Sequence, residues 1–367
     1  MHISVMPRRA RSRFFSTPLT IAYTFLGLNA IGTLLLMLPF THYGSASPLF
    51  LTALFTATSA VTDTALVVED TASFWTFYGK IVILALMYVG GLGFMTLATF
   101  GLVIIGQRIT ISQRLLAREF LSVNQLGGLV RLAIGVVIVA TAIQVAGLIL
   151  LAIRFSAAYS WPQAIWQGAF HSVSAFNSAG FNILNEPEKL VAYQRDPMVL
   201  GIMTTLIFIG AISYLVIIDV ARYRWFSRYT LNTKLVLALT ALMIPVAAGS
   251  FLLVEYSNPT TLGPLSVQEK VVGSVFHGVS NRTAGFNIID FSATNEGTQF
   301  LTTAFMFVGG ASASVTGGIK VNTLAIILVA VLAAANGRSN PRAFGREVPW
   351  EQVRRALVIG LTAAVFV

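Results

Sequence analysis

Three stretches of this sequence repeat one pattern of small, hydroxyl and amide residues. FHSVSAFNSAGFNIL begins at Phe170, FHGVSNRTAGFNII begins at Phe276, and a fainter copy, FTATSAVTDTALVV, begins at Phe55. Two of the copies contain a glycine that can adopt a positive φ and has no side chain, so several backbone carbonyls can face one axis. A ring of carbonyls can replace the hydration shell of a bare cation. The pattern therefore predicts cation binding by backbone oxygens.

Aligning the copies on their shared residues gives the positions that we expect to face the cation. Each copy predicts a helix followed by a short extended stretch, and the helix would direct its negative C-terminal end toward a common centre. Ser266 and Glu269 match a capping box at the start of the third helix. The expected cation-binding residues are Thr62, Asp63, Thr64 and Ala65 in the first copy, Asn177, Ser178, Ala179 and Gly180 in the second, and Arg282, Thr283, Ala284 and Gly285 in the third.

The composition places these stretches in a membrane protein. Of 367 residues, 56% are hydrophobic and only 10% are charged, and the mean hydropathy is +0.77, as is typical of polytopic membrane proteins. Cysteine is absent, which excludes disulfides and thiolate metal sites. No clustered carboxylates and no Ser/His/Asp grouping support an enzyme. We expect His171 and His277 to be hydrogen-bonded structural residues and not metal ligands.

Six apolar runs are long enough to span a bilayer, which takes about 20 mostly apolar residues. The three polar copies lie between the first and second, third and fourth, and fifth and sixth runs. The sequence therefore predicts an all-α polytopic membrane protein built from repeats of helix, re-entrant pore loop and helix. The runs lie near residues 18–40, 80–106, 131–154, 198–219, 233–255 and 298–335, and the repeats are expected at 1–106, 107–222 and 223–337.

The last segment, 338–367, is expected to be a cytoplasmic loop and the start of a fourth repeat that the sequence cuts short. Its apolar run begins at Ala356 and is too short to cross a bilayer. A short hydrophobic tail lying on the membrane is the alternative interpretation.

The net charge of +10 is explained by membrane topology. The basic loops QRITISQRLLAREF, from Gln107, and ARYRWFSRYTLNTK, from Ala221, fall on the same side as the N-terminal arginines when the spans alternate. Basic loops stay inside, so we expect a cytoplasmic N-terminus, with the polar copies entering from outside. The basic residues form no folded patch, so no nucleic-acid partner is expected. The first apolar run lacks a small-residue cleavage site and is interpreted as a retained transmembrane helix.

The sixth apolar run is interrupted in its middle by glycines and hydroxyl residues, which break a helix. A broken helix at membrane depth has to line a cavity or be buried in protein; close small-residue packing between helices is the alternative. Lys320, just after the interruption, could repel cations, satisfy loop carbonyls or pair with an acid. The interruption consists of Gly309, Gly310, Ala311, Ser312, Ala313, Ser314, Val315, Thr316, Gly317 and Gly318.

The motifs FTATSAVT, FHSVSAFNSAGF, NRTAGFN and GGASASVTGGIK closely resemble the Trk/Ktr/HKT superfamily of potassium and sodium translocating proteins, in particular the KtrB-like membrane subunits of bacterial Ktr systems. The resemblance covers essentially the whole chain. It implies helix, pore-loop, helix units with pseudo-fourfold symmetry around one cation pathway in the bacterial cytoplasmic membrane. It further implies that 309–318 and Lys320 form a gate beneath the filter.

The same resemblance implies partners. It implies a homodimer of membrane subunits, a cytosolic nucleotide-binding (KtrA-like) regulatory ring, and no cofactor on this chain, with ATP or ADP expected only on the ring. Membrane lipids are an equally simple partner for the basic inner loops.

Two residues of the first copy depart from the family pattern. The family usually has glycine where Ala65 stands and an apolar residue where Asp63 stands. In the plant branch a non-glycine residue at the first position accompanies sodium preference, so the resemblance leaves K⁺ or Na⁺ as the transported ion, with a Na⁺-selective HKT-like channel as the alternative. An alternating-access symporter is a further alternative. Asp63 could hold a cation, or it could point behind the filter and pair with a neighbour such as Arg282.

Overall fold

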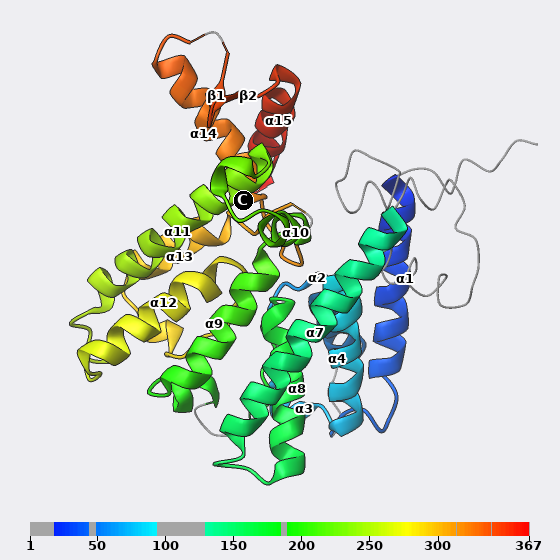
Figure 1. Ribbon diagram of the computed structural model, residues 1–367. Coiled ribbons are helices and arrows are strands. Elements are labelled where there is room, and N and C mark those ends of the chain that lie inside the picture. Colours follow the sequence, from blue (N-terminus) through cyan, green and yellow to red (C-terminus); the bar gives the residue numbers. More distant parts are fainter. Residues whose placement is uncertain are drawn as a thin grey trace, which may run out of the picture.

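A computed structural model describes residues 18–43, 49–93, 129–184, 189–312, 314–338 and 340–366, and these are largely helical (Figure 1). The predicted all-α class is confirmed, apart from one small antiparallel hairpin. The helices are α1 (Pro18–Leu36), α2 (Leu49–Thr62), α3 (Thr71–Phe74), α4 (Phe77–Leu92), α7 (Leu129–Phe155), α8 (Trp161–Phe176), α9 (Pro197–Ala211), α10 (Tyr214–Arg222), α11 (Leu231–Glu255), α12 (Val267–Thr283), α13 (Glu296–Met306), α14 (Val321–Ala335) and α15 (Trp350–Phe366). The short elements are η2 (Lys189–Tyr193), η3 (Phe226–Arg228), η4 (Phe291–Ala293), β1 (Arg342–Ala343) and β2 (Arg346–Glu347).

The helices pack in three successive groups. Helix α2 packs against α1 and α4, α8 packs between α7 and α9, and α12 packs against α11 and α13. Neighbouring groups join where α8 contacts α4 and where α12 contacts α9. In each group the middle helix ends inside one polar copy of the sequence. This helix, together with the chain that follows it to the end of the copy, is hereafter called a hairpin. The boundaries at 106, 222 and 337 stay a prediction, and residue 106 lies outside the described residues.

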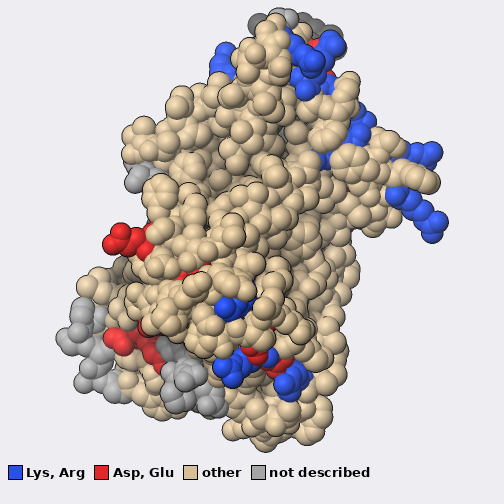
Figure 2. Space-filling model, turned by 90° about the vertical axis from the view of Figure 1, so that its left-hand side faces the viewer, with Lys and Arg blue, Asp and Glu red and all other residues tan. Residues whose placement is uncertain are grey.

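The length and exposure of the helices fit a membrane protein. Within the described ranges, Arg131–Phe155 and Leu231–Glu255 are each long and apolar enough to cross a bilayer. Large apolar side chains are exposed on the outside of the bundle, among them Leu253 and Phe300, as expected for contact with lipid. A broad belt without charge separates the end carrying α15, where Lys and Arg gather, from the opposite end, where acidic and basic residues lie together (Figure 2).

The predicted span 198–219 is not one straight helix. Helices α9 and α10 meet at an angle of 96°. Ile212 is extended, with a ψ of 136°, and Ser213 caps α10 by accepting a hydrogen bond from Leu215 N–H at 3.2 Å. Hydropathy predicted a continuous span because it is an average over a whole apolar stretch. Such an average does not detect that Ser213, which follows Gly210, caps a new helix. The run 298–335 is broken as predicted, into α13 and α14.

Candidate functional site

The three copies of the polar pattern meet at one point in the structure, although they are far apart in the sequence. A Cβ atom added to Gly180 would lie 2.3 Å from Cβ of Ala65 and 2.5 Å from the carbonyl oxygen of Ala284. One added to Gly285 would lie 2.5 Å from the same Ala65 Cβ. The ends of the three hairpins therefore touch, and only residues with little or no side chain fit where they do.

The backbone at this meeting point is left-handed in every copy. The φ angles are 61° at Ala65, 70° at Gly180 and 68° at Gly285, with further positive values at Asp63 and Ser178. A positive φ turns the chain back sharply and costs an L-residue roughly 1–2 kcal/mol, a cost that glycine does not have. Ala65 therefore has the same positive φ as the two glycines in spite of its side chain.

Helix C-termini surround the meeting point. Helices α2, α8 and α12 end at Thr62, Phe176 and Thr283. Their last carbonyls have no partner further along the helix and carry partial negative charge, which favours a cation. The predicted capping box at the other end of α12 is confirmed, with Ser266 N–H donating to Glu269 Oε2 at 2.8 Å.

One detail of the predicted extended stretches was wrong. Thr62, Arg282 and Thr283 belong to the last turns of α2 and α12. The third copy is one residue shorter than the others, and its helix runs on to Thr283, so the return of the chain starts later.

A serine in each helix ties the returning chain to it, and the sequence analysis did not single it out. Ser174 Oγ donates to the carbonyl of Phe181 at 2.8 Å, and Ser280 Oγ donates to that of Phe286 at 2.7 Å. In the first copy Ser59 Oγ instead accepts from Leu66 N–H at 3.1 Å. The sequence does contain a signal for this role, because the serine stands four residues after the first phenylalanine of every copy.

The two histidines are held as structural residues. Nδ1 of His171 lies 2.8 Å from the carbonyl oxygen of Gln167, and Nε2 of the same ring lies 2.8 Å from Asn182 Oδ1. His277 stacks on Phe251 with ring centroids 4.5 Å apart. In the described part of the chain, His, Asp and Glu form no group of three that could hold a metal ion.

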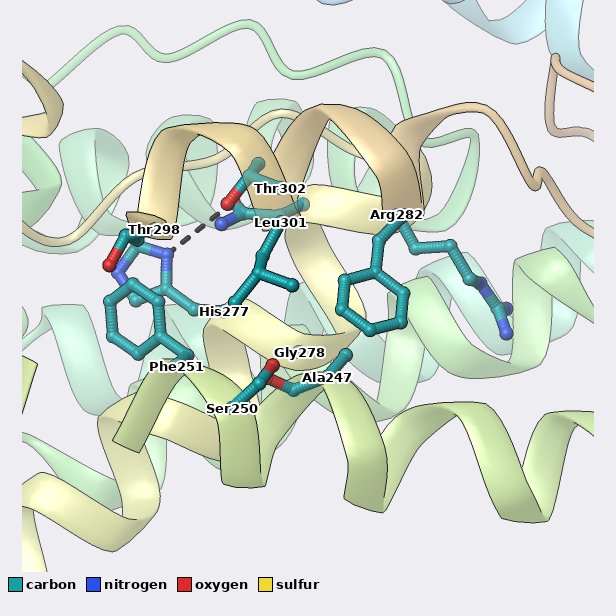
Figure 3. A pocket seen from close by; sticks show the side chains of 11 residues that line it. Ala247, Ser250, Phe251, His277, Gly278, Arg282, Thr298, Leu301 and Thr302 are labelled. Carbon is teal, nitrogen blue, oxygen red and sulfur yellow. Dashed lines mark hydrogen bonds between the residues drawn. The ribbon is translucent and has the colours of Figure 1, made fainter. Parts of the chain in front are cut away.

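Arg282 and Asp63 are both buried near the meeting point, but they are not partners. No ion pair joins them among the described residues, so the interpretation of Asp63 as the partner of Arg282 was wrong. Figure 3 shows that Arg282 points away from the small pocket between α11, α12 and α13 that His277 enters. Asp63 Oδ1 and the Nε and Nη1 atoms of Arg282 have no hydrogen-bond partner.

The segment 309–318 forms a compact loop between α13 and α14. Gly309 N–H donates to the carbonyl of Ile319 at 2.9 Å, and Val321 N–H donates to that of Gly310, also at 2.9 Å. A Cβ added to Gly309 would lie 1.7 Å from the carbonyl oxygen of Gly317. Gly309 is thus required for the loop to fold on itself. Ala313 lies outside the described residues.

This loop rests on the break between α9 and α10. The bend leaves the carbonyls of Gly210 and Ala211 without helical partners, and they accept from Val315 N–H at 3.4 Å and Ala311 N–H at 3.0 Å. Gly210 also lies against the end of α8, where a Cβ would come 1.8 Å from the carbonyl oxygen of Phe176. The broken span, the loop and the end of α8 therefore form one packed unit.

Lys320 satisfies the loop itself. Its ammonium group donates a hydrogen bond to the carbonyl of Thr316, and among the described residues it has no acidic partner. The sequence left three interpretations of Lys320 open. The geometry agrees with a hydrogen bond to a loop carbonyl and excludes an ion pair with an acidic residue among the described residues. Asn322 adds a second tie, because its Oδ1 accepts from Ser312 N–H at 2.9 Å while its Nδ2 donates to Asn232 on α11.

Comparisons with known proteins agree with this architecture. The chain matches the family TrkH, described as "Cation transport protein", over residues 4–367. It is 37% identical to the Ktr system potassium uptake protein B of Bacillus subtilis (strain 168), over 96% of this chain and 78% of that protein. It is 34% identical to the potassium/sodium uptake protein NtpJ of Enterococcus hirae, over 97% of this chain and 78% of that protein. The crystal structure of the potassium transporter TrkH from Vibrio parahaemolyticus superposes with a TM-score of 0.69 at 17% identity, covering 98% of this chain and 71% of that chain, which shows a shared fold.

Proposed function

The chain belongs to the TrkH family of cation transport proteins, and we propose that it moves monovalent cations through a filter built by its three converging hairpin ends. It is a membrane transporter and not an enzyme. The observation that carries the proposed filter is the meeting of Ala65, Gly180 and Gly285, each with positive φ, at the C-terminal ends of three helices. In this proposal a cation loses its water to the carbonyls of 62–65, 177–180 and 282–285.

The loop 309–318 is the proposed gate on the ion path. It lies against the end of α8 through Gly210, so an ion that leaves the filter would meet it next. Its main-chain hydrogen bonds to α9 and the Lys320 bond to Thr316 hold it in a compact form. Opening would require these bonds to break, and a few hydrogen bonds of ~1 kcal/mol each are within the range of a conformational switch.

We propose K⁺ as the main transported ion, with Na⁺ as a competing one. The name of the Bacillus subtilis relative specifies potassium, and that of the Enterococcus hirae relative specifies potassium and sodium. The methyl group of Ala65 lies between Gly180 and Gly285 and reduces the space that a larger ion would need. This steric change would weaken discrimination against the smaller ion.

The proposed setting is the bacterial cytoplasmic membrane, with the basic end of Figure 2 in the cytoplasm. The Ktr system named for the relatives supports a regulatory partner, which we propose to be a cytosolic, nucleotide-binding ring beside a homodimer of this chain. Exposed basic residues, including Arg222 in the last turn of α10 and Arg346 in β2, are available to such a ring or to anionic lipid headgroups.

The test is a flux assay on the full-length protein in liposomes, loaded with K⁺ and diluted into trace ⁸⁶Rb⁺. Accumulation of ⁸⁶Rb⁺ above that of empty liposomes is expected, with external K⁺ competing strongly and Na⁺ competing more weakly. If the protein took up neither Rb⁺ nor Na⁺, with or without the regulatory partner, the proposed function would be wrong.

A further inference from the structure

Three buried polar side chains near the first hairpin have atoms without a hydrogen-bond partner. Asp63 and Tyr214 are each 7% exposed, and Asn177 is 0% exposed. The atoms concerned are Asp63 Oδ1, the Tyr214 hydroxyl oxygen, and both amide atoms of Asn177. A buried polar group without a partner costs about 1–3 kcal/mol, so three of them in one region need an explanation.

Adjacent glycines of α4 contact the end of α2 and the side chain of Asn177. A Cβ added to Gly90 would lie 2.3 Å from the carbonyl oxygen of Val61, two residues before Asp63. One added to Gly91 would lie 2.4 Å from Oδ1 of Asn177. A single turn of α4 therefore packs on the ends of both α2 and α8, and the amide of Asn177 lies against Gly91.

The broken span brings the third side chain to the same place. Tyr214 is the first residue of α10, directly after the 96° bend. Its ring packs in the same buried cluster as Phe176, the residue before Asn177, and Leu92, the residue after Gly91. Tyr88, which is on the same face of α4 as Gly91, packs against this cluster. The Tyr88 hydroxyl is already hydrogen-bonded to Thr141 at 2.7 Å, so Tyr214 provides the free oxygen. In a straight helix Tyr214 would continue along the axis of α9.

We propose that Asp63, Asn177 and Tyr214 form a side-chain site for a monovalent cation, between the carbonyl filter and the loop 309–318. The site rests on the proposed function and adds to it, because its ligands are side chains and Tyr214 lies outside the repeated pattern. A carboxylate, an amide oxygen and a phenol oxygen are hard donors that suit an alkali cation. The single carboxylate balances one positive charge, whereas Ca²⁺ takes six to eight oxygen ligands, commonly with several carboxylates. The site would hold an ion after it leaves the filter and before the gate opens.

The test is the concentration dependence of ⁸⁶Rb⁺ uptake by the full-length protein in liposomes. Asp63→Asn keeps the shape of the side chain and removes its charge, and we expect KM for Rb⁺ to rise about tenfold while Vmax is kept. Tyr214→Phe removes one oxygen, and KM should rise about threefold. The matched control is Glu69→Gln, which removes the charge of an exposed acid beyond the same hairpin and should leave KM unchanged.

Two outcomes would overturn the site. One is an unchanged KM in active Asp63→Asn protein. The other is read from wild-type crystals soaked in Rb⁺, so that it needs no active variant: anomalous density at the filter but none within coordination distance of Asp63 and Tyr214. Absence of Rb⁺ uptake by the wild type would instead contradict the proposed function, and the crystals would still test the site.

Discussion

The Cβ atom of Ala65 occupies the space beside Gly180, so that a side chain at residue 180 would meet it at 2.3 Å. Both residues have a positive φ, 61° and 70° respectively. The first hairpin thus has a methyl group at this position, where the other two hairpins have glycine. The contact sets how closely the hairpins approach, and substitutions on either side of it have opposite expected effects.

Gly180→Ala should abolish most transport. The added methyl group would lie under 3.0 Å from Ala65 and from the carbonyl of Ala284, and the positive φ adds strain. We expect at least about a tenfold fall in Vmax for Rb⁺ uptake, since filter geometry tolerates little displacement. Gly201→Ala is the control, because a Cβ there has nothing within 4 Å. Equal activity of the two variants would contradict the proposed role of Gly180.

Ala65→Gly should sharpen the preference for K⁺ over Na⁺. The change removes the methyl group between Gly180 and Gly285 and relieves roughly 1–2 kcal/mol of backbone strain. In the liposome assay, Na⁺ should compete several-fold less well with Rb⁺. Ala65→Ser keeps the Cβ, so in this variant Na⁺ should compete with Rb⁺ as strongly as in the wild type, or more strongly. If all three proteins showed the same Na⁺ competition, the methyl group would not set selectivity.

The structure confirms what the sequence could express as composition and repetition. The all-α class, the break in the sixth apolar run and the Ser266 capping box all follow from residue types at regular positions. The bend before Tyr214 and the separation of Asp63 from Arg282 did not follow, because both depend on how distant helices pack. Hydropathy is the same for a straight and a bent apolar helix, and charge pairing cannot be inferred without side-chain directions.

Ser174→Ala should loosen the second hairpin without unfolding the bundle. It removes the hydrogen bond from Ser174 Oγ to the carbonyl of Phe181, with a cost of about 1 kcal/mol. We expect a fall in Tm of a few degrees or less, together with increased Na⁺ uptake. The control is Ser250→Ala on α11, whose hydroxyl donates to the carbonyl of Ala247 at 3.0 Å, a bond within its own helix that does not tie down a returning chain. If Tm fell but the preference between K⁺ and Na⁺ stayed the same, Ser174 would contribute to stability only and not to ion selection.

Lys320→Met should raise the rate of ion passage. The ammonium group of Lys320 is held by the carbonyl of Thr316 inside the compact loop, so the substitution removes both that bond and a positive charge. The loop would open more easily, and a cation would meet less repulsion, because two unit charges at 4 Å interact by about 4 kcal/mol at an effective dielectric constant of 20. We expect Vmax for Rb⁺ uptake to rise about three- to tenfold with little change in KM.

Lys270→Met is the matched control for this gate prediction. Lys270 makes the same kind of bond, from Nζ to the carbonyl of Tyr256 at 2.8 Å, but it does so at the start of α12. Its loss should lower stability slightly and leave Vmax unchanged. If Lys320→Met instead decreased uptake while the protein stayed folded, Lys320 would be needed to form the ion path, and the proposed closing role of its bond to Thr316 would be wrong.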